Sequence, residues 1–274
     1  MQDLTEKVMN GVELDEQAIC RATEALLDES IDHESKAGFL EALSLKGESA
    51  AEIAGFASEF LARAVEPGLN REAIGKPLLD VCGTGGDKLN LFNVSTTSVF
   101  LLAAAGIAVV KHGNRGITSK SCVAEVGAGF LFAPLYHPAF KAVVPVRKLL
   151  AERGKRTIFN LLGPLLNPAR PDYQLIGVFD PAVGAVFADI LDRLGRQHAW
   201  AVHGRRSRRN GRTLNPWRIH HLGDKQIKQG RVHPSTLFTR NLSAHARRTT
   251  RRRCRRKCRH TPRNSRWQYH RPKT

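Results

Sequence analysis

Two short loops carry residue types that can bind a phosphorylated ligand. The first loop is residues 83–87 (GTGGD), after an apolar run at 77–81. Glycines let the backbone approach an anionic oxygen closely and direct several N–H groups at it. Residues 93–96 (NVST) follow and begin a helix, whose amino terminus favours phosphate. Either segment alone is also typical of an ordinary turn or helix cap, but together they predict a phosphate site.

The second loop, residues 111–121 (KHGNRGITSKS), ends another apolar run at 107–111. It combines cations, an amide and hydroxyls around two glycines. Arginine makes forked contacts to phosphate and lysine supplies a point charge, so this set suits a polyphosphate. The alternative is a solvated basic loop, which its position directly after a buried strand disfavours.

The segments around these loops predict an α/β fold. Short apolar runs alternate with helical patterns, which favours a mainly parallel sheet. Ligands of such sheets bind at the carboxyl ends of the strands, where both glycine loops fall. We expect helices at 95–105 and 183–194, and strands at 77–81, 107–111, 156–160, 175–179 and 199–202.

The first 66 residues predict helices alone. Apolar residues recur at helical spacing in 15–27, 35–44 and 48–65, and Pro67-Gly68 ends the last pattern. We therefore expect a small N-terminal all-helical domain at 1–67, which packs on itself or on a second copy. A larger α/β domain with a mainly parallel sheet is expected to follow at 68–204.

The net charge of +18 hides a break in composition. Residues 205–274 hold 23 of the 43 Lys and Arg but only one of the 25 acids, Asp224. Residues 1–204 therefore carry −4 and the tail +22. With few aliphatic positions, the tail cannot offset its ordering entropy, so we expect a disordered basic tail that binds polyanions non-specifically.

Cysteine usage and hydropathy point to the cytoplasm. The five cysteines are scattered and odd in number, which favours reduced thiols. No apolar run reaches the roughly 18 residues that a membrane span requires. The acidic, polar amino terminus is not a signal peptide. We expect no membrane association.

Several ordered motifs in residues 1–204 together resemble the anthranilate phosphoribosyltransferase family. They are 80–87 (DVCGTGGD), 93–96, 111–121, 130–134 (FLFAP) with His137-Pro138, 145–147 (PVR) and 156–168 (RTIFNLLGPLLNP). The resemblance implies that anthranilate and phosphoribosyl pyrophosphate give phosphoribosyl-anthranilate and pyrophosphate, with Mg²⁺ as cofactor and a homodimer as assembly. It implies no protein nucleophile, because catalysis would consist of positioning and charge stabilisation.

The resemblance also implies site residues. Anthranilate would contact Gly83, Asn114 and Arg147, with Arg147 facing its carboxylate. Ser95 would contact Mg²⁺, and His137 would shape the pocket. Phosphoribosyl pyrophosphate would contact Gly83, Gly86, Asp87, Asn93, Val94, Ser95, Thr96, Lys111, His112, Gly113, Asn114, Arg115, Gly116, Ile117, Thr118 and Ser119.

The chain departs from the family pattern after Ser121. The family continues there into a helix and a loop, whereas here residues 121–125 lead almost at once into 130–134. We interpret this as an internal deletion. Loss of the helix is expected to expose apolar surface and to loosen the phosphate site.

A second departure concerns the metal. After the strand end at 202–204 the family places a Gly-x-Asp-Glu segment that binds Mg²⁺, whereas residues 210–217 here read NGRTLNPW. Mg²⁺ binds to negatively charged oxygen ligands such as carboxylates. By assisting the departure of pyrophosphate, it stabilises the transition state by several kcal/mol. We therefore expect impaired or absent activity. Our hypothesis is a frameshift after about residue 204, and translation of the gene's other two frames tests it.

Two alternative functions remain open from the sequence. A non-catalytic, nucleic-acid-binding relative could use the same scaffold with its basic tail. The tail offers few aromatic residues for base stacking, namely Trp217, Trp267 and Tyr269. A pyrimidine nucleoside phosphorylase-like enzyme would share the fold, but residues 113–115 (GNR) disfavour it.

Overall fold

The protein is described by a computed structural model covering residues 1–84, 93–114 and 125–204. Four further strands between residues 207 and 232 are described by their backbone alone. All of these residues belong to one compact unit, Met1–His233. Predictions for 85–92, for 115–124 and for the tail beyond residue 232 lie outside the described residues.

Four of the five N-terminal helices begin where a short polar side chain caps them, whereas the first, at residues 2–9, has no side-chain cap. The five helices are α1 (Gln2–Met9), α2 (Glu16–Leu27), α3 (His33–Lys46), α4 (Ala50–Ala62) and the short α5 (Arg71–Ile74). Asp15, Asp32 and Ser49 each accept a hydrogen bond from a first-turn N–H. Ser49 and Glu52 form a reciprocal capping box. The helices predicted at 15–27, 35–44 and 48–65 are confirmed, with ends that shift to these caps.

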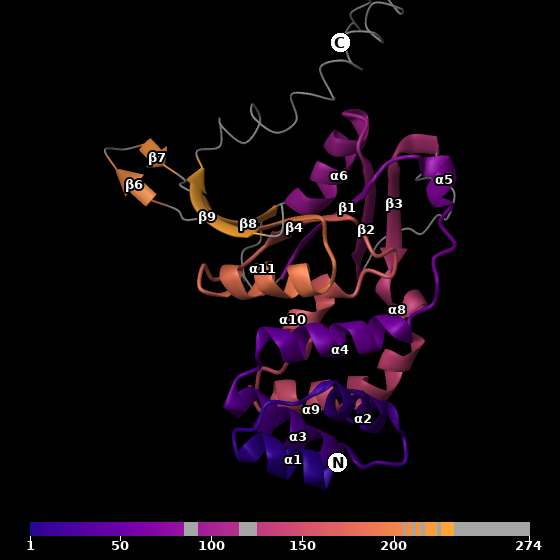
Figure 1. The fold of residues 1–274 in the computed structure, drawn as a ribbon, viewed down its shortest axis with the longest axis vertical. Coiled ribbons are helices and arrows are strands. Elements are labelled where there is room, and N and C mark those ends of the chain that lie inside the picture. The colour runs from indigo at the N-terminus through magenta and orange to yellow at the C-terminus, as the bar shows by residue number, and fades with distance from the viewer. Residues whose placement is uncertain are drawn as a thin grey trace, which may run out of the picture. The chain divides into compact units, whose positions relative to one another are not determined.

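The helical layer is completed by a later part of the chain (Figure 1). This part contains α8 (Ala133–Tyr136), the 3₁₀ turn η1 (Pro138–Val143), α9 (Val144–Glu152), α10 (Phe159–Leu162) and the 3₁₀ turn η2 (Gly163–Leu165). The ring of Phe60 in α4 lies 4.7 Å from that of Phe140 and 5.7 Å from that of Phe159. The first four helices therefore share their core with residues that follow much later in the chain.

The expected strand at 156–160 is wrong. Ile158 and Phe159 are buried in the helical core, at 1% and 5% exposure. Asn160 accepts a hydrogen bond from the Thr157 N–H at 2.8 Å, which supports the turn into α10. A short apolar run fits a strand and a buried helical turn equally well, so its pattern alone could not separate the two.

A seven-stranded sheet forms the α/β part of the fold. Its order is β3-β2-β1-β4-β5-β8-β9. The first five are parallel and the last two join antiparallel, so the expected mainly parallel sheet is confirmed. The bounds are β1 (Leu78–Gly83), β2 (Ala108–Gly113), β3 (Ala128–Phe132), β4 (Tyr173–Gly177), β5 (His198–Gly204), β8 (Trp217–Gly223) and β9 (Gln226–Val232).

The sheet continues past residue 204, where we expected the α/β domain to end. Strand β8 pairs antiparallel with β5, with His221 opposite Trp200. The chain segment that connects β5 to β8 contains strands β6 (Ser207–Arg209) and β7 (Arg212–Leu214), which form a separate antiparallel hairpin. The change to basic composition at residue 205 therefore does not coincide with the end of the sheet.

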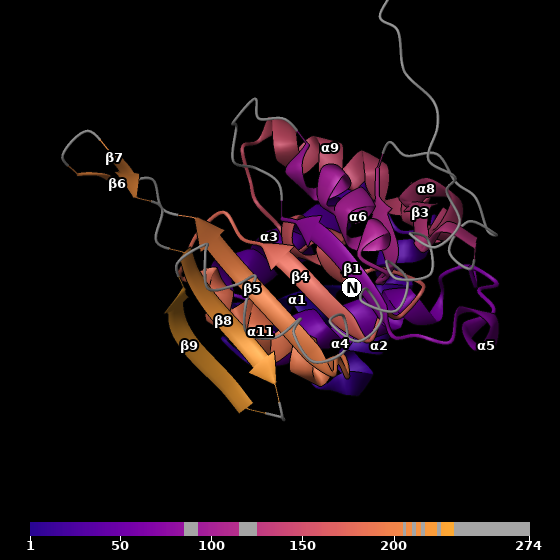
Figure 2. The ribbon, with the colours of Figure 1, turned by 90° about the horizontal axis from the view of Figure 1, so that it is seen from above.

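The two faces of the sheet are covered unequally. Helix α11 (Val183–Arg193) and the large core lie on one face, and α6 (Val94–Ala104) lies on the other. In β4, Gln174 and Ile176 point towards the α11 side and are 1% and 0% exposed, whereas Leu175 on the other side is half-buried. From above, no described helix lies over β4, β5, β8 and β9 (Figure 2).

Candidate functional site

The carboxyl ends of β1 and β2 bring the two glycine segments together. The strands are parallel neighbours, with Leu78 opposite Ala108. They therefore end side by side at Gly83 and Gly113, and Asn114 follows directly. This edge is where a parallel sheet binds its ligands.

Thr84, which the sequence reasoning did not single out, fixes the start of the first loop. Its N–H donates to the carbonyl oxygen of Gly177 at 2.9 Å, and its hydroxyl oxygen lies 3.3 Å from the same carbonyl. The Phe179 N–H donates to the Thr84 hydroxyl at 3.3 Å. These bonds tie the end of β1 to the end of β4.

The segment at 93–96 begins α6 as predicted. The Asn93 side chain accepts a hydrogen bond from the Thr96 N–H at 3.0 Å, which is an N-cap. Since α6 connects two parallel strands, it runs against them, and its amino end lies at their carboxyl edge. Val94 and Ser95 stand in its first turn, where N–H groups and the helix dipole favour an anion.

Lys111 and His112 were both predicted to bind the ligand, and they differ in whether their side-chain nitrogens already have hydrogen-bond partners. The Lys111 ammonium donates to the carbonyl oxygen of Val81 at 2.9 Å, so its charge is held against β1. His112 is 7% exposed, and its Nε2 has no hydrogen-bond partner among the described residues. Burial, reinforced by the neighbouring His137, lowers the pKa of His112 to about 3, so its imidazole is neutral.

His137 lies against His112 and is also neutral. The two ring centroids are 5.2 Å apart in an edge-to-face arrangement. The His137 Nε2 is 2.8 Å from the carbonyl oxygen of Leu166 and therefore donates to it. Burial lowers the pKa of His137. Both imidazoles can shape a pocket, but neither brings a positive charge to it.

Beneath the strand ends lies a buried polar network that the sequence reasoning missed. The Gln174 amide donates to Asp80 at 3.3 Å and to the carbonyl oxygen of Pro164 at 2.6 Å. Gln174 accepts from the Arg196 Nε at 3.1 Å. Burial raises the pKa of Asp80 to about 6, while the cations of Lys111 and Arg196 oppose this shift. A charged residue inside an apolar strand pattern was the available signal.

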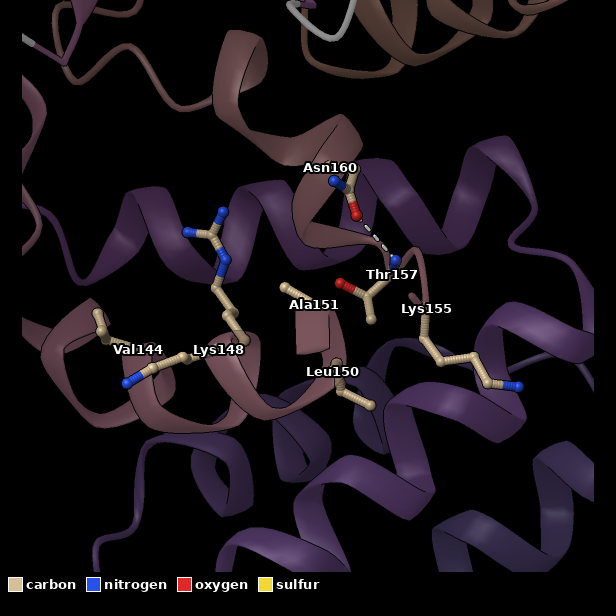
Figure 3. Close-up of a pocket in the computed structure, with 8 residues that line it drawn as sticks. Val144, Lys148, Leu150, Ala151, Lys155, Thr157 and Asn160 are labelled. Carbon is tan, nitrogen blue, oxygen red and sulfur yellow. Dashed lines mark hydrogen bonds between the residues drawn. The ribbon is translucent and has the colours of Figure 1, made fainter. Parts of the chain in front are cut away.

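Arg147 lines a pocket of about 310 Å³ between α9 and the segment that leads into α10 (Figure 3). The volume is at the low end of small-molecule sites. The lining holds three cations and no acid: Val144, Arg147, Lys148, Leu150, Ala151, Lys155, Thr157 and Asn160. Loss of hydration lowers the pKa of Arg147, although a guanidinium stays charged in proteins. Such a pocket suits a small carboxylate.

A row of rings links this pocket to the end of β2. The Arg147 guanidinium lies 5.6 Å from the Phe159 ring centroid, a cation–π distance. Phe159 is 5.8 Å from Phe140, and Phe140 is 5.5 Å from His137. His137 in turn contacts His112. The two predicted substrate regions are thus joined by packed side chains.

Part of the predicted site lies outside the described residues, namely Gly86, Asp87, Arg115, Gly116, Ile117, Thr118 and Ser119. Within the described part of the chain, no three His, Cys, Asp or Glu side chains come together as a metal site would require. Ser95 therefore has no carboxylate cluster beside it. The described residues do not fit a protein-held Mg²⁺ site.

Two family models match the chain. The model for "Glycosyl transferase family, helical bundle domain" matches residues 2–64, and the model for "Glycosyl transferase family, a/b domain" matches 75–124 and 120–246. Helices α1 to α4 fall in the first match, whereas the sheet and the later helices α8 to α10 fall in the second. The chain thus has the two-part fold of a glycosyl transferase family, with a helical bundle domain and an a/b domain.

Curated relatives narrow the class. An anthranilate phosphoribosyltransferase of Ignicoccus hospitalis is 46% identical, over 74% of this chain and 64% of that protein. The Desulfatibacillum aliphaticivorans enzyme of the same name is 34% identical, over 86% of this chain and 74% of that protein. This chain belongs to the anthranilate phosphoribosyltransferase family.

The alignments support the predicted deletion. The Ignicoccus alignment is 224 positions long, but 74% of 274 residues is only about 203 residues. About 21 positions of that alignment therefore have no residue in this chain. The two segments of the a/b domain match meet at 120–124, where the sequence predicted the missing helix. The chain spans 62–74% of the length of the curated relatives compared.

Solved structures agree on the fold. An anthranilate phosphoribosyltransferase from Thermus thermophilus is 36% identical with a TM-score of 0.72, over 86% of this chain and 74% of that one. A Saccharomyces cerevisiae enzyme of the same name, in complex with PRPP and Mg, has a TM-score of 0.67 over 91% of this chain and 78% of that one. The latter is 24% identical, so its likeness is one of fold.

Within the described residues, no helix is long and apolar enough to cross a membrane.

Proposed function

We propose that this chain is an anthranilate phosphoribosyltransferase that retains its substrate sites and has lost most of its catalytic power. The observation that carries the proposal is the juxtaposition of Gly83 and Asn114 at neighbouring strand ends, with Arg147 linked to them by packed rings. The sugar pyrophosphate would occupy the strand ends. The anthranilate carboxylate would face Arg147.

The reaction needs no nucleophile from the protein. The amine nitrogen of anthranilate forms a bond to ribose C1, the bond from C1 to the pyrophosphate oxygen breaks, and the amine loses a proton. The protein contributes by holding the two reactants in line and by stabilising the departing anion. Because His112 and His137 are neutral, stabilisation of that anion depends on backbone N–H groups, the start of α6 and the cations of the second loop.

The missing metal ligands limit the rate. Mg²⁺ would neutralise charge on the pyrophosphate, and we expect the family's cofactor requirement to apply here too. Residues 205–274 contain a single acid, Asp224, so no adjacent acid pair is present to hold it. Metal assistance is worth several kcal/mol, so its loss lowers the rate by orders of magnitude.

Loss of anthranilate fluorescence on addition of phosphoribosyl pyrophosphate and Mg²⁺ tests the proposal. We expect titratable binding of anthranilate but turnover at least about a hundredfold below that of the Ignicoccus relative, as a loss of about 3 kcal/mol implies. Turnover at the rate of that relative would refute the impairment. Absence of anthranilate binding by a folded chain would refute the substrate assignment.

The assembly we propose is a homodimer through the helical layer, in the cytoplasm. Met9 on α1 and Leu45 on α3 are 73% and 81% exposed, and Val12, which follows α1 in the chain, is 49% exposed. Apolar side chains this exposed favour a protein contact. Light scattering after size exclusion should give twice the mass of one chain. The Leu45→Lys substitution should reduce the measured mass towards that of a single chain.

A further inference from the structure

Residues 156–160 (RTIFN) carry two polar side chains to which the proposed function gives no role. Ile158 and Phe159 of this segment are buried in the helical core, at 1% and 5% exposure. Thr157 and Asn160, on either side of that buried pair, line the pocket that also contains Arg147. The segment thus places two polar residues in the pocket where the anthranilate carboxylate is proposed to bind.

Two hydrogen bonds fix Asn160 against Thr157. The Thr157 N–H donates to the Asn160 side-chain oxygen at 2.8 Å, and the Asn160 N–H donates to the Thr157 carbonyl oxygen at 2.9 Å. Only the oxygen of a carboxamide can accept from an N–H group, so the first bond determines which way the amide is turned. Figure 3 shows this bond, with the amide oxygen facing the Thr157 nitrogen. The amide nitrogen, Nδ2, therefore remains as a donor on the other branch.

The Asn160 Nδ2 forms no hydrogen bond with another residue in the described part of the chain, although it has two protons to donate. Its side chain is exposed and lies in the wall of the pocket. The pocket lining contains no carboxylate that could accept these protons. A few such polar groups fix the orientation of a ligand in most small-molecule sites. This donor, in a cationic pocket, suits an anionic oxygen of the ligand.

Arg147 approaches the same part of the pocket from α9. Its guanidinium lies 5.6 Å from the ring centroid of Phe159, the residue directly before Asn160. The other two cations of the lining, Lys148 and Lys155, have their ammonium groups at opposite ends of it in Figure 3. Arg147 is therefore the cation that the structure places beside Phe159 and next to Asn160.

We propose that Asn160 is a specificity-determining residue, whose Nδ2 donates to one oxygen of the anthranilate carboxylate while the Arg147 guanidinium binds the other. This inference rests on the proposed function, because it assigns a second donor to the same carboxylate. Since the Asn160 oxygen is held by Thr157, the side chain cannot turn to accept a hydrogen bond from the ligand. A neutral amide in place of the carboxylate would set one donor against another, so Asn160 selects the acid.

The substitution Asn160→Asp separates this role from a structural one. Aspartate keeps an oxygen for the Thr157 N–H, so the turn stays braced, but a negatively charged acceptor replaces the Nδ2 donor. Fluorescence titration compares anthranilate with 2-aminobenzamide, in which a carboxamide replaces the carboxylate. We expect N160D to bind anthranilate at least about tenfold more weakly than the parent chain does. It should bind 2-aminobenzamide more tightly, because the amide of that ligand can donate to the new carboxylate.

A matched control makes the same chemical change at another exposed asparagine. The Asn70 side-chain oxygen accepts from the Ala73 N–H at 2.9 Å, three residues further along the chain, as Asn160 and Thr157 are three residues apart. Asn70 does not line the pocket. The Asn70→Asp variant should therefore bind both ligands as the parent chain does. Thermal unfolding of N160D should give the midpoint of the parent chain, which checks that the turn is intact.

Two results with N160D would overturn the inference alone. The first is an unchanged affinity for anthranilate in a parent chain that binds it. The second is an equal weakening of both ligands, which a damaged turn would produce. A folded parent chain that does not bind anthranilate would overturn the proposed function and this inference with it, so the two failures are distinguishable.

Discussion

Replacement of Asp80 by asparagine should change how the stability of the fold depends on pH. Asp80 in β1 has no exposed surface, and burial raises its pKa from 3.8 to about 6. Its Oδ1 has no hydrogen-bond partner among the described residues. The folded state therefore binds the Asp80 proton more tightly than the unfolded state does.

The sign and the size follow from this difference. The protonated Asp80 carboxyl stabilises the folded state fully below pH 4. This stabilisation is lost as the pH rises from about 4 to 6, and it stays lost above that range. A difference of about two units at 1.36 kcal/mol per unit amounts to about 3 kcal/mol. The amide of the D80N variant cannot ionise, so this variant should gain about that much relative to the parent chain between pH 4 and pH 7.

Urea and thermal unfolding of both proteins at half-unit steps from pH 4 to pH 7.5 measure the effect. For a domain of this size, the difference in midpoint temperature should change by about 6–12 °C across the range. Asp28→Asn is a flat control, because hydrogen bonds from Ser30 lower the pKa of Asp28 and its titration therefore falls below the measured range. Parallel pH profiles for the parent chain and D80N would refute the reasoning.

Three further predictions concern binding, packing and the tail. Arg147→Gln should weaken anthranilate binding about ten- to a hundredfold in a fluorescence titration, since it removes a charged hydrogen bond; an unchanged affinity would place the carboxylate elsewhere. Phe187→Ala, 1% exposed, should destabilise the fold by about 3–5 kcal/mol in urea, and Val186→Ala beside it, 36% exposed, by at most about 0.5. Removal of 234–274 deletes 14 of the 23 Lys and Arg that follow residue 204 and should weaken salt-sensitive binding to duplex DNA; equal binding by the shortened chain would contradict the prediction.

Hydrophobic period and caps predicted the helices α2, α3, α4, α6 and α11 and the strands β1, β2, β4 and β5. The helices at 15–27 and 183–194 and the strand at 107–111 lie close to the observed bounds because their patterns are long or bounded by glycine. Strand β3 was not predicted, and 156–160 was assigned to the wrong class. Both are short apolar segments whose state depends on what packs against them, and the helical core around Phe159 is assembled from distant parts of the chain.

The candidate site was predictable only in part. The glycine segments and the Asn93 cap could be read from residue type and spacing, because their geometry is local. The Gln174 network could not, since its partners Asp80, Pro164 and Arg196 converge from three separate segments. The same holds for the contact of Arg147 with Phe159.

The shared core of the helical layer has a consequence for how the chain folds as it is synthesised. Phe60 leaves the ribosome long before Phe140 and Phe159, the rings that enclose it. Until residues 138–166 emerge, α2 and α4 present an apolar surface that has no native partner, and such surface invites aggregation. The amino-terminal helices should therefore depend on chaperones, or on slow translation, over a stretch of about a hundred residues, and a fragment of residues 1–67 should not form a stable fold by itself.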